Sequence, residues 1–223
     1  MINIFFFKEW LKTKRLVYIS TAAIIVMSIY IAINFQRSYT ITGANELWEY
    51  MLKGRDSMST DIEFLPLIVG IVLALSQYIP EMHNKCLKLT LHLPVHPMYS
   101  LYAMLGYGVV VLITQAILSI CAIEIGILHI FLHEIRYSII ITIVPWYLGG
   151  IAAYLLSAWI ILEPSWKRRI LYLLLAIPIT SIYYLTSTPG AYGKIMPLLI
   201  LFTPTLSLLA PMSVYRFKEG NQD

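Results

Sequence analysis

The segment Tyr137–Leu162 reads YSIIITIVPWYLGGIAAYLLSAWIIL and contains no charged side chain. A helix needs about 20 predominantly apolar residues to cross the hydrocarbon core of a bilayer. Apolar and polar residues do not alternate along the segment, as they would in the strands of a transmembrane barrel. The segment therefore predicts a membrane-spanning helix.

Five further charge-free runs lie on either side of this segment. Together they predict six transmembrane helices, because backbone groups that face lipid must satisfy their hydrogen bonds within their own helix. The expected fold class is an all-α integral membrane protein, with residues 1–223 forming a single transmembrane domain. The six predicted spans are about 16–36, 64–79, 99–123, 137–162, 170–186 and 195–215.

The composition excludes most other classes of protein. Hydrophobic residues make up 59% of the chain and charged residues 13%, about half the charge of an ordinary soluble domain. So few charges cannot cover a water-exposed surface, and so apolar a chain is not a disordered segment. The formal net charge of +4 comes from positive residues scattered around apolar runs, which indicates membrane topology rather than nucleic-acid binding.

Positive residues are unevenly divided between the two sets of loops. With the N-terminus inside, 11 Lys and Arg residues fall on the inner side and 5 on the outer side. Because cytoplasmic loops are enriched in Lys and Arg, we expect an N-in, C-in orientation in the cytoplasmic (inner) membrane. The inner residues are Lys8, Lys12, Lys14, Arg15, Lys85, Lys88, Lys167, Arg168, Arg169, Arg216 and Lys218, and the outer ones are Arg37, Lys53, Arg55, Arg136 and Lys194.

Two segments outside the spans have helical patterns. Residues 2–15 place apolar and basic side chains on separate helical faces, which predicts an interfacial helix on the inner membrane surface. The alternative is a basic segment beside the first span that holds no defined angle to the membrane surface. In the outer loop 37–63, Asn45 could begin a short helix and Gly54 could end it.

The chain has no recognisable catalytic or nucleotide-binding motif. The sequences Gly-x-Ser-x-Gly, His-Glu-x-x-His and Gly-x-x-x-x-Gly-Lys-Ser/Thr do not occur. We therefore expect no catalytic residue, no bound cofactor and no metal site in this chain. His129 and His133 have a spacing that could share a metal on a helix, but no clear third ligand lies on the same face.

Two polar residues are candidates for substrate contact or gating. Gln115 lies deep in the third run, where it would form an interhelical hydrogen bond or contact a substrate. Glu124 ends the same run, either in a water-filled vestibule or at the headgroups. Ionisable residues are otherwise almost missing from the spans, which argues against a proton- or ion-coupled carrier.

Small and helix-breaking residues also occur inside the spans. Gly149, Gly150, Ala152 and Ala153 form a small-residue surface, which predicts a packing seam within the bundle or a contact between subunits. Prolines free backbone groups and can kink a helix. Those inside the predicted spans are Pro145, Pro178, Pro197 and Pro204.

The first inner loop, Pro80–Pro97, reads PEMHNKCLKLTLHLPVHP. An acid begins it, a leucine-rich stretch follows, and Leu-Pro-Val closes it. This pattern resembles the ABC-2 type permeases, the membrane subunits of ATP-binding cassette exporters. The six spans, the N-in, C-in layout and the basic N-terminal segment with Lys8-Glu9 are also similar to that family. The matching loop positions are Glu81, Leu87, Leu89, Leu91, Leu93, Pro94 and Val95.

The resemblance implies that residues 80–97 form a coupling loop that docks on a cytosolic ABC ATPase dimer. ATP and Mg²⁺ would then be bound by the ATPase, and a second permease copy or a related permease would complete the transporter. The expected function is export of an amphiphilic or hydrophobic substrate (lipid, peptide or drug) through the membrane, and the chain itself is not an enzyme. A stand-alone carrier or channel and a non-transporting scaffold or sensor are the alternatives. The expected coupling residues are Glu81, Lys85, Leu87, Lys88, Leu91 and Pro94.

Overall fold

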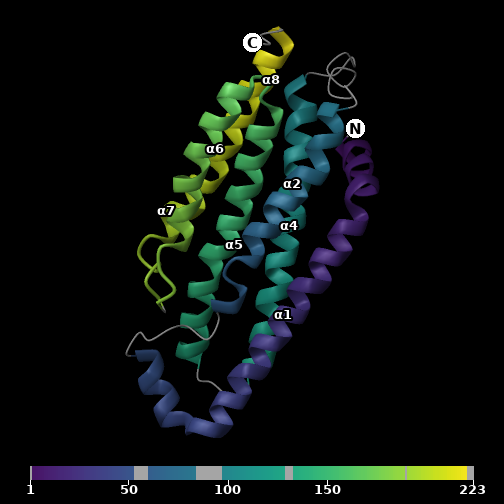
Figure 1. Cartoon of the computed structure of the whole chain (residues 1–223). Coiled ribbons are helices and arrows are strands. Elements are labelled where there is room, and N and C mark those ends of the chain that lie inside the picture. The colour runs from purple at the N-terminus through teal and green to yellow at the C-terminus, as the bar shows by residue number, and fades with distance from the viewer. Residues whose placement is uncertain (1, 53–59, 84–96, 129–132, 189, 220–223) are drawn as a thin grey trace.

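The computed structural model describes residues 2–52, 60–83, 97–128, 133–188 and 190–219. Within these ranges the chain is helical, without strands, and Figure 1 shows the helices as an elongated bundle along a common axis. The α-helices are α1 (Ile2–Leu52), α2 (Leu65–His83), α4 (Pro97–Ile127), α5 (His133–Leu162), α6 (Trp166–Ser181), α7 (Met196–Thr205) and α8 (Leu209–Glu219), and the 3-10 helices are η1 (Thr60–Ile62), η2 (Ile182–Tyr184) and η3 (Leu206–Leu208).

Five helices of the described ranges are long and apolar enough to cross a membrane. The protein is therefore all-helical, with the character of a multi-pass membrane protein. The sixth expected span is not confirmed, because α6 has only 16 residues and a length of about 24 Å, against about 30 Å for the hydrocarbon core. The five candidates are Ile4–Ile41, Leu65–His83, Met98–Ile127, Arg136–Leu162 and Met196–Arg216.

The expected interfacial helix at residues 2–15 is not seen as a separate element. These residues are the first turns of α1, which continues without a break as far as Gly43. No glycine or proline occurs before Gly43, so nothing in the sequence ends the helix earlier. Gly43 has φ 78° and ψ 166°, a conformation that glycine adopts without steric cost, and α1 changes direction there (Figure 1).

The centre of the bundle is α5, which packs against α2, α4, α6, α7 and α8. Its closest approach is to α2, where the two backbones nearly touch. A Cβ atom added to Gly150 would lie 2.6 Å from the carbonyl oxygen of Pro66, and one added to Gly70 would overlap the carbonyl oxygen of Gly150. Ala152 and Ala153 are buried as well. The small-residue surface is therefore a packing seam inside the bundle.

The prolines affect their helices in different ways. α5 continues through Pro145, and Pro197 lies in the first turn of α7, where a missing N–H interrupts no hydrogen bond. α7 ends one residue after Pro204 and changes to the 3-10 turn η3. The last predicted span is thus built from three short helices.

Candidate functional site

The ends of the predicted coupling loop lie beside the N-terminus. α2 ends at His83 and α4 begins at Pro97, at the end of the bundle that also holds both chain termini (Figure 1). The ring of Phe5 in α1 lies 6.4 Å from the ring of Tyr99 in α4, which confirms this position. Of the expected coupling residues, Glu81 is described, and the others lie outside the described residues: Lys85, Leu87, Lys88, Leu91 and Pro94.

Glu81 lies in a buried group of charges between α1 and α2. Its side chain is 2% exposed, its Oε1 accepts a hydrogen bond from Lys12 Nζ at 2.6 Å, and Lys8 Nζ lies 2.8 Å away. Glu9 is fully buried, with its Oε1 2.7 Å from Lys12 Nζ. We call these four residues the α1–α2 charge cluster. Two carboxylates face two ammonium groups, which is the pairing that buried charges require.

Helical spacing explains how α1 contributes three members of this cluster. Lys8 and Lys12 are four residues apart and Glu9 precedes Lys12 by three, so the three share one face. That face is turned towards the last turn of α2, which carries Glu81. The helical pattern of residues 2–15 predicted only surface charges for the lysines, and their pairing with an acid on another helix was not anticipated.

A hydrogen-bonded polar group lies one helical turn before Glu81. The Tyr154 hydroxyl of α5 donates to Gln77 Oε1 at 2.9 Å and lies 3.1 Å from the Tyr78 hydroxyl. Gln77 Nε2 donates to the carbonyl oxygen of Met104 at 2.8 Å. These contacts join α2 to α4 and α5. They could not be predicted from the sequence, because Gln77 lies near the end of an apolar run and a buried tyrosine has no distinctive pattern.

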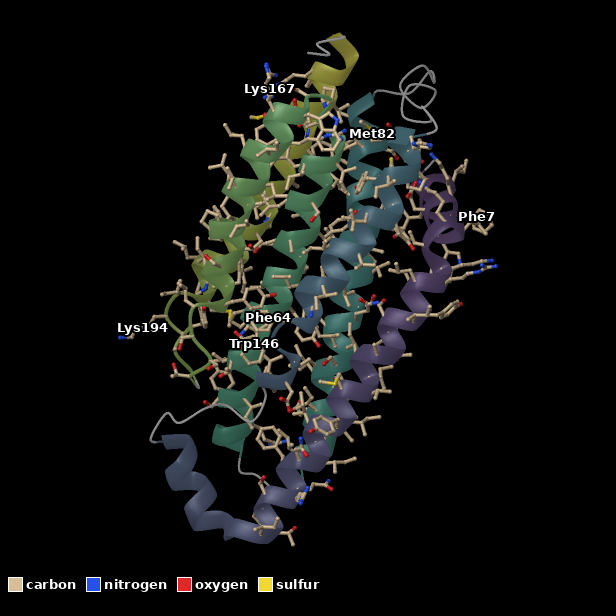
Figure 2. All side chains as sticks on the ribbon, in the orientation of Figure 1. Phe7, Phe64, Met82, Trp146, Lys167 and Lys194 are labelled. Carbon is tan, nitrogen blue, oxygen red and sulfur yellow. The ribbon has the colours of Figure 1, made fainter. Side chains whose placement is uncertain are left out.

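A third buried carboxylate, Glu163, follows α5 at the same end of the bundle, where Lys167 and Met82 are labelled in Figure 2. Ser213 Oγ donates to its Oε2 at 2.6 Å, with Arg216 Nη1 3.5 Å from the same oxygen. Arg168 Nη1 is 4.0 Å from Oε1, and Arg169 Nε donates to the backbone carbonyl at 2.6 Å. No sequence pattern indicates this burial, because Glu163 stands just outside an apolar run. We call Glu163, Arg168, Arg169, Ser213 and Arg216 the Glu163 cluster.

Gln115 forms interhelical hydrogen bonds. This is one of the two roles expected for it, the other being contact with a substrate. Its Nε2 donates to Ser20 Oγ at 2.8 Å and to Thr21 Oγ1 at 3.0 Å, both on α1. It therefore helps to hold α4 against α1. Two hydroxyl pairs join the same helices: Thr13 with Tyr107 at 2.7 Å, and Ser28 with Ser119 at 2.6 Å.

Glu124 lies near the opposite end of α4 and is partly exposed. Its Oε1 is 3.9 Å from Arg136 Nη1 at the beginning of α5. The carboxylate is 44% exposed and the two groups are far apart for an ion pair, so we expect the pair to contribute about 0–1 kcal/mol to stability. Glu124 therefore has a charge partner inside the chain, and no vestibule is needed to explain its position.

Metal-binding side chains do not gather within the part of the chain that the structure describes. No three His, Cys, Asp or Glu side chains come together there. His129 and the side chain of His133 lie outside the described residues, so their expected spacing on one helical face is not tested.

An apolar groove of about 390 Å³ lies among α4, α5 and α7. Two of its hydroxyl groups already have partners, since Thr203 Oγ1 donates to the Leu199 carbonyl at 2.8 Å and Ser207 Oγ to the Pro204 carbonyl at 2.7 Å. Neither Gln115 nor Glu124 lines it. The groove offers contact to a hydrophobic molecule and no charged group. Its lining includes Tyr102, Leu105, Ile113, Leu148, Leu155 and Ile200.

The chain thus combines membrane-length helices, two buried charge clusters at one end and an apolar groove on one side. These features occur in several classes of membrane protein, so they do not identify a family by themselves. Comparison with protein-family models, with curated proteins and with solved structures finds no match for this chain.

Proposed function

We propose that this chain is the membrane permease subunit of an ATP-driven exporter, as its resemblance to the ABC-2 type permeases implies. It would work with a cytosolic ABC ATPase dimer, which binds ATP and Mg²⁺, and with a second copy of itself or a related permease. The substrate would be an amphiphilic or hydrophobic molecule such as a lipid, a peptide or a drug. The chain would bind and move this substrate and carry out no chemical step on it.

Six membrane passes with both termini in the cytoplasm are part of this proposal. α6 and η2 together extend over about 30 Å, taking about 1.5 Å per α-helical residue and about 2.0 Å per 3-10 residue. This equals the thickness of the hydrocarbon core. The two termini lie at the same end of the bundle (Figure 1), as an even number of passes requires. The excess of Lys and Arg expected at that end supports its assignment to the cytoplasm.

The proposal rests mainly on how the last turn of α2, where the predicted loop 80–97 begins, is held in the bundle. Glu81 is paired with Lys8 and Lys12 on α1, and Tyr78 contacts Tyr154 on α5. A displacement of the beginning of the loop would therefore move α1 and the central helix with it. A loop that only connects two helices needs no such attachment, so these contacts favour transmission of force.

The apolar groove is the candidate surface for the substrate. Leu155 lines the groove, and its neighbour Tyr154 is bonded to α2 one turn before Glu81. The loop and the groove would thus be connected through α5. The uncharged lining suits an acyl chain or another apolar group, because no buried donor or acceptor would be left without a partner.

The test is co-purification from the native host in mild detergent, followed by an ATPase assay. The wild-type chain should bring with it a soluble ATPase, and the double substitution Leu87→Asp and Leu91→Asp should release it. Leu185→Asp is the matched control, because Leu185 is an exposed leucine in the turn after η2, away from the loop. The control should retain the ATPase.

One outcome would contradict the proposal. If the wild-type chain is well folded and free of any ATPase while the genes of the candidate partners are expressed, the resemblance is misleading. A stand-alone carrier or channel would then have to move substrate after reconstitution alone, and a scaffold or sensor would move none.

A further inference from the structure

Three arginines contact Glu163 where α5, α6 and α8 meet, and Lys167 stands beside two of them in the first turn of α6. Glu163 is the one acidic side chain described in this turn, and its carboxylate is shared by Arg168 and Arg216. Arg169 and Lys167 add two further positive charges. The described part of this turn therefore has a surplus of about three positive charges, which its own carboxylate does not neutralise.

These cations differ in how many contacts they already make with other described residues. Arg169 donates to two backbone carbonyls, that of Ile161 in α5 and that of Glu163 just after it, and its guanidinium lies 5.2 Å from the centre of the Trp166 ring. Among the described residues, Arg168 has only a 4.0 Å contact with Glu163. Lys167 is exposed and forms no ion pair within the described residues. Lys167 and Arg168 are thus available to an external anion, whereas Arg169 is held by the fold.

The surface next to this pair is apolar and points away from the bundle. Trp166, Ile170, Leu174 and Ile177 follow one another at helical spacing and are all exposed, Trp166 by 73%. Residues at this spacing share one face of α6, and Figure 2 shows α6 at the outside of the bundle with Lys167 at its end. A molecule bound here meets positive charge at one end and an apolar face along the helix.

We propose that Lys167 and Arg168 bind the phosphate of an anionic phospholipid whose acyl chains lie along the exposed face of α6. A positive pair at the end of a membrane helix attracts anionic headgroups, and an exposed tryptophan beside it is the side chain expected at headgroup depth. A free phosphate ion would use the two cations but would leave the adjoining apolar face uncovered. This inference does not depend on the proposed exporter function.

The experiment is native mass spectrometry of the delipidated chain in mild detergent, titrated with phosphatidylglycerol or phosphatidylcholine. We expect saturable binding of phosphatidylglycerol about tenfold tighter than binding of phosphatidylcholine. The double substitution Lys167→Gln and Arg168→Gln should abolish this preference. Lys14→Gln with Arg15→Gln removes the same charge from exposed residues of α1 near the N-terminus and should leave the preference intact.

Three results would overturn the proposal. Equal weakening by both double substitutions would mean that the whole basic end attracts anionic lipid without a site. No weakening by Lys167→Gln and Arg168→Gln would place the lipid elsewhere, and displacement of the lipid by glycerol phosphate at the same concentration would indicate a free phosphate site. Lys167→Gln alone removes no described contact, so this variant should fold normally and should weaken lipid binding in part. It therefore tests the proposal even if the double variant fails to fold.

Discussion

At the scale of single residues, the two lysines that face Glu81 are not equivalent. Lys12 is 22% exposed and contacts both Glu81 and Glu9, whereas Lys8 is 40% exposed and contacts Glu81. Removing one partner from a buried ion pair leaves an uncompensated charge, but removing a solvated partner costs little. The stability of the α1–α2 charge cluster should therefore depend mainly on Lys12.

We expect Lys12→Gln to lower the free energy of unfolding by about 3 kcal/mol and Lys8→Gln to lower it by about 1 kcal/mol or less. Denaturant or thermal unfolding of the purified protein in detergent micelles measures both changes. Lys14→Gln is the control, since Lys14 is exposed, and it should be near neutral. Equal losses for Lys8 and Lys12 would mean that the cluster is more solvated than its geometry indicates.

We expect Gln115 to contribute to the stability of the protein and not to substrate binding. Gln115→Leu removes the hydrogen bonds to Ser20 and Thr21 and should cost about 1 kcal/mol, the usual size of an interhelical hydrogen bond in a membrane. Ser20→Ala in the same background should then add less than it does in the wild-type chain, because the shared contact is already gone. Unfolding of the two single variants and the double variant tests this. A change in substrate preference without a loss of stability would restore the substrate role.

Some of these residue-level contacts could be anticipated from the sequence and others could not. The interhelical hydrogen bond of Gln115 was one of two predicted roles, because a lone amide inside an apolar run needs a partner. The burial of Glu81 and Glu163 was not predicted. Each stands next to a charge-free run, and only the packing of other helices determines whether such a position faces water or the bundle.

At the scale of the helices, the close contact between α2 and α5 makes a sharp comparison between two glycines possible. A Cβ atom on Gly150 would press on the backbone of Pro66, which cannot move aside as a flexible side chain can. A Cβ atom on Gly106, which lines the apolar groove on α4, would meet no atom within 4 Å. Both glycines lie inside α-helices, so their intrinsic helix propensities are matched.

We expect Gly150→Ala to destabilise the protein by about 1–3 kcal/mol through overpacking. Gly106→Ala should be neutral in packing and should stabilise α4 by up to about 1 kcal/mol, the difference in helix propensity. Thermal unfolding in detergent distinguishes the two. A destabilising Gly106→Ala would show that another molecule fills the groove in the purified protein, and a neutral Gly150→Ala would contradict the close packing of α2 and α5.

The helices themselves follow the apolar runs closely in the middle of the chain and less well at its ends. Spans 99–123 and 137–162 lie within α4 and α5, because long charge-free runs have one economical conformation in lipid. The charged residues before the predicted span 16–36 do not mark the beginning of α1. A helix can continue through basic residues where no glycine or proline ends it. The run 195–215 is interrupted by η3, where Pro204 removes a backbone donor.

At the scale of the whole molecule, the buried carboxylates of the described residues and their basic partners lie towards one end of the bundle. The α1–α2 charge cluster and the Glu163 cluster both lie there, beside the ends of α2 and α4 (Figures 1 and 2). The uneven distribution of Lys and Arg could be read from the sequence, but the pairing of these cations with buried carboxylates depends on residues far apart in the chain. The proposed partner is indicated only by the resemblance of the loop 80–97, because contacts inside the bundle do not determine what binds outside it.

The orientation of the bundle in the membrane can be tested together with the question of whether α6 crosses the membrane. Lys167 at the beginning of α6 and Lys194 just before α7 lie towards opposite ends of the bundle (Figure 2). In a chain whose cysteines, Cys86 and Cys121, are replaced by serine, Lys194→Cys should react with a membrane-impermeant maleimide in intact cells. Lys167→Cys should react only after permeabilisation, because the proposed orientation places the Lys- and Arg-rich end in the cytoplasm. Labelling of both positions from outside would mean that α6 does not cross, in keeping with its short length. Labelling of Lys167→Cys alone would reverse the orientation and move the loop 80–97 away from any cytosolic ATPase.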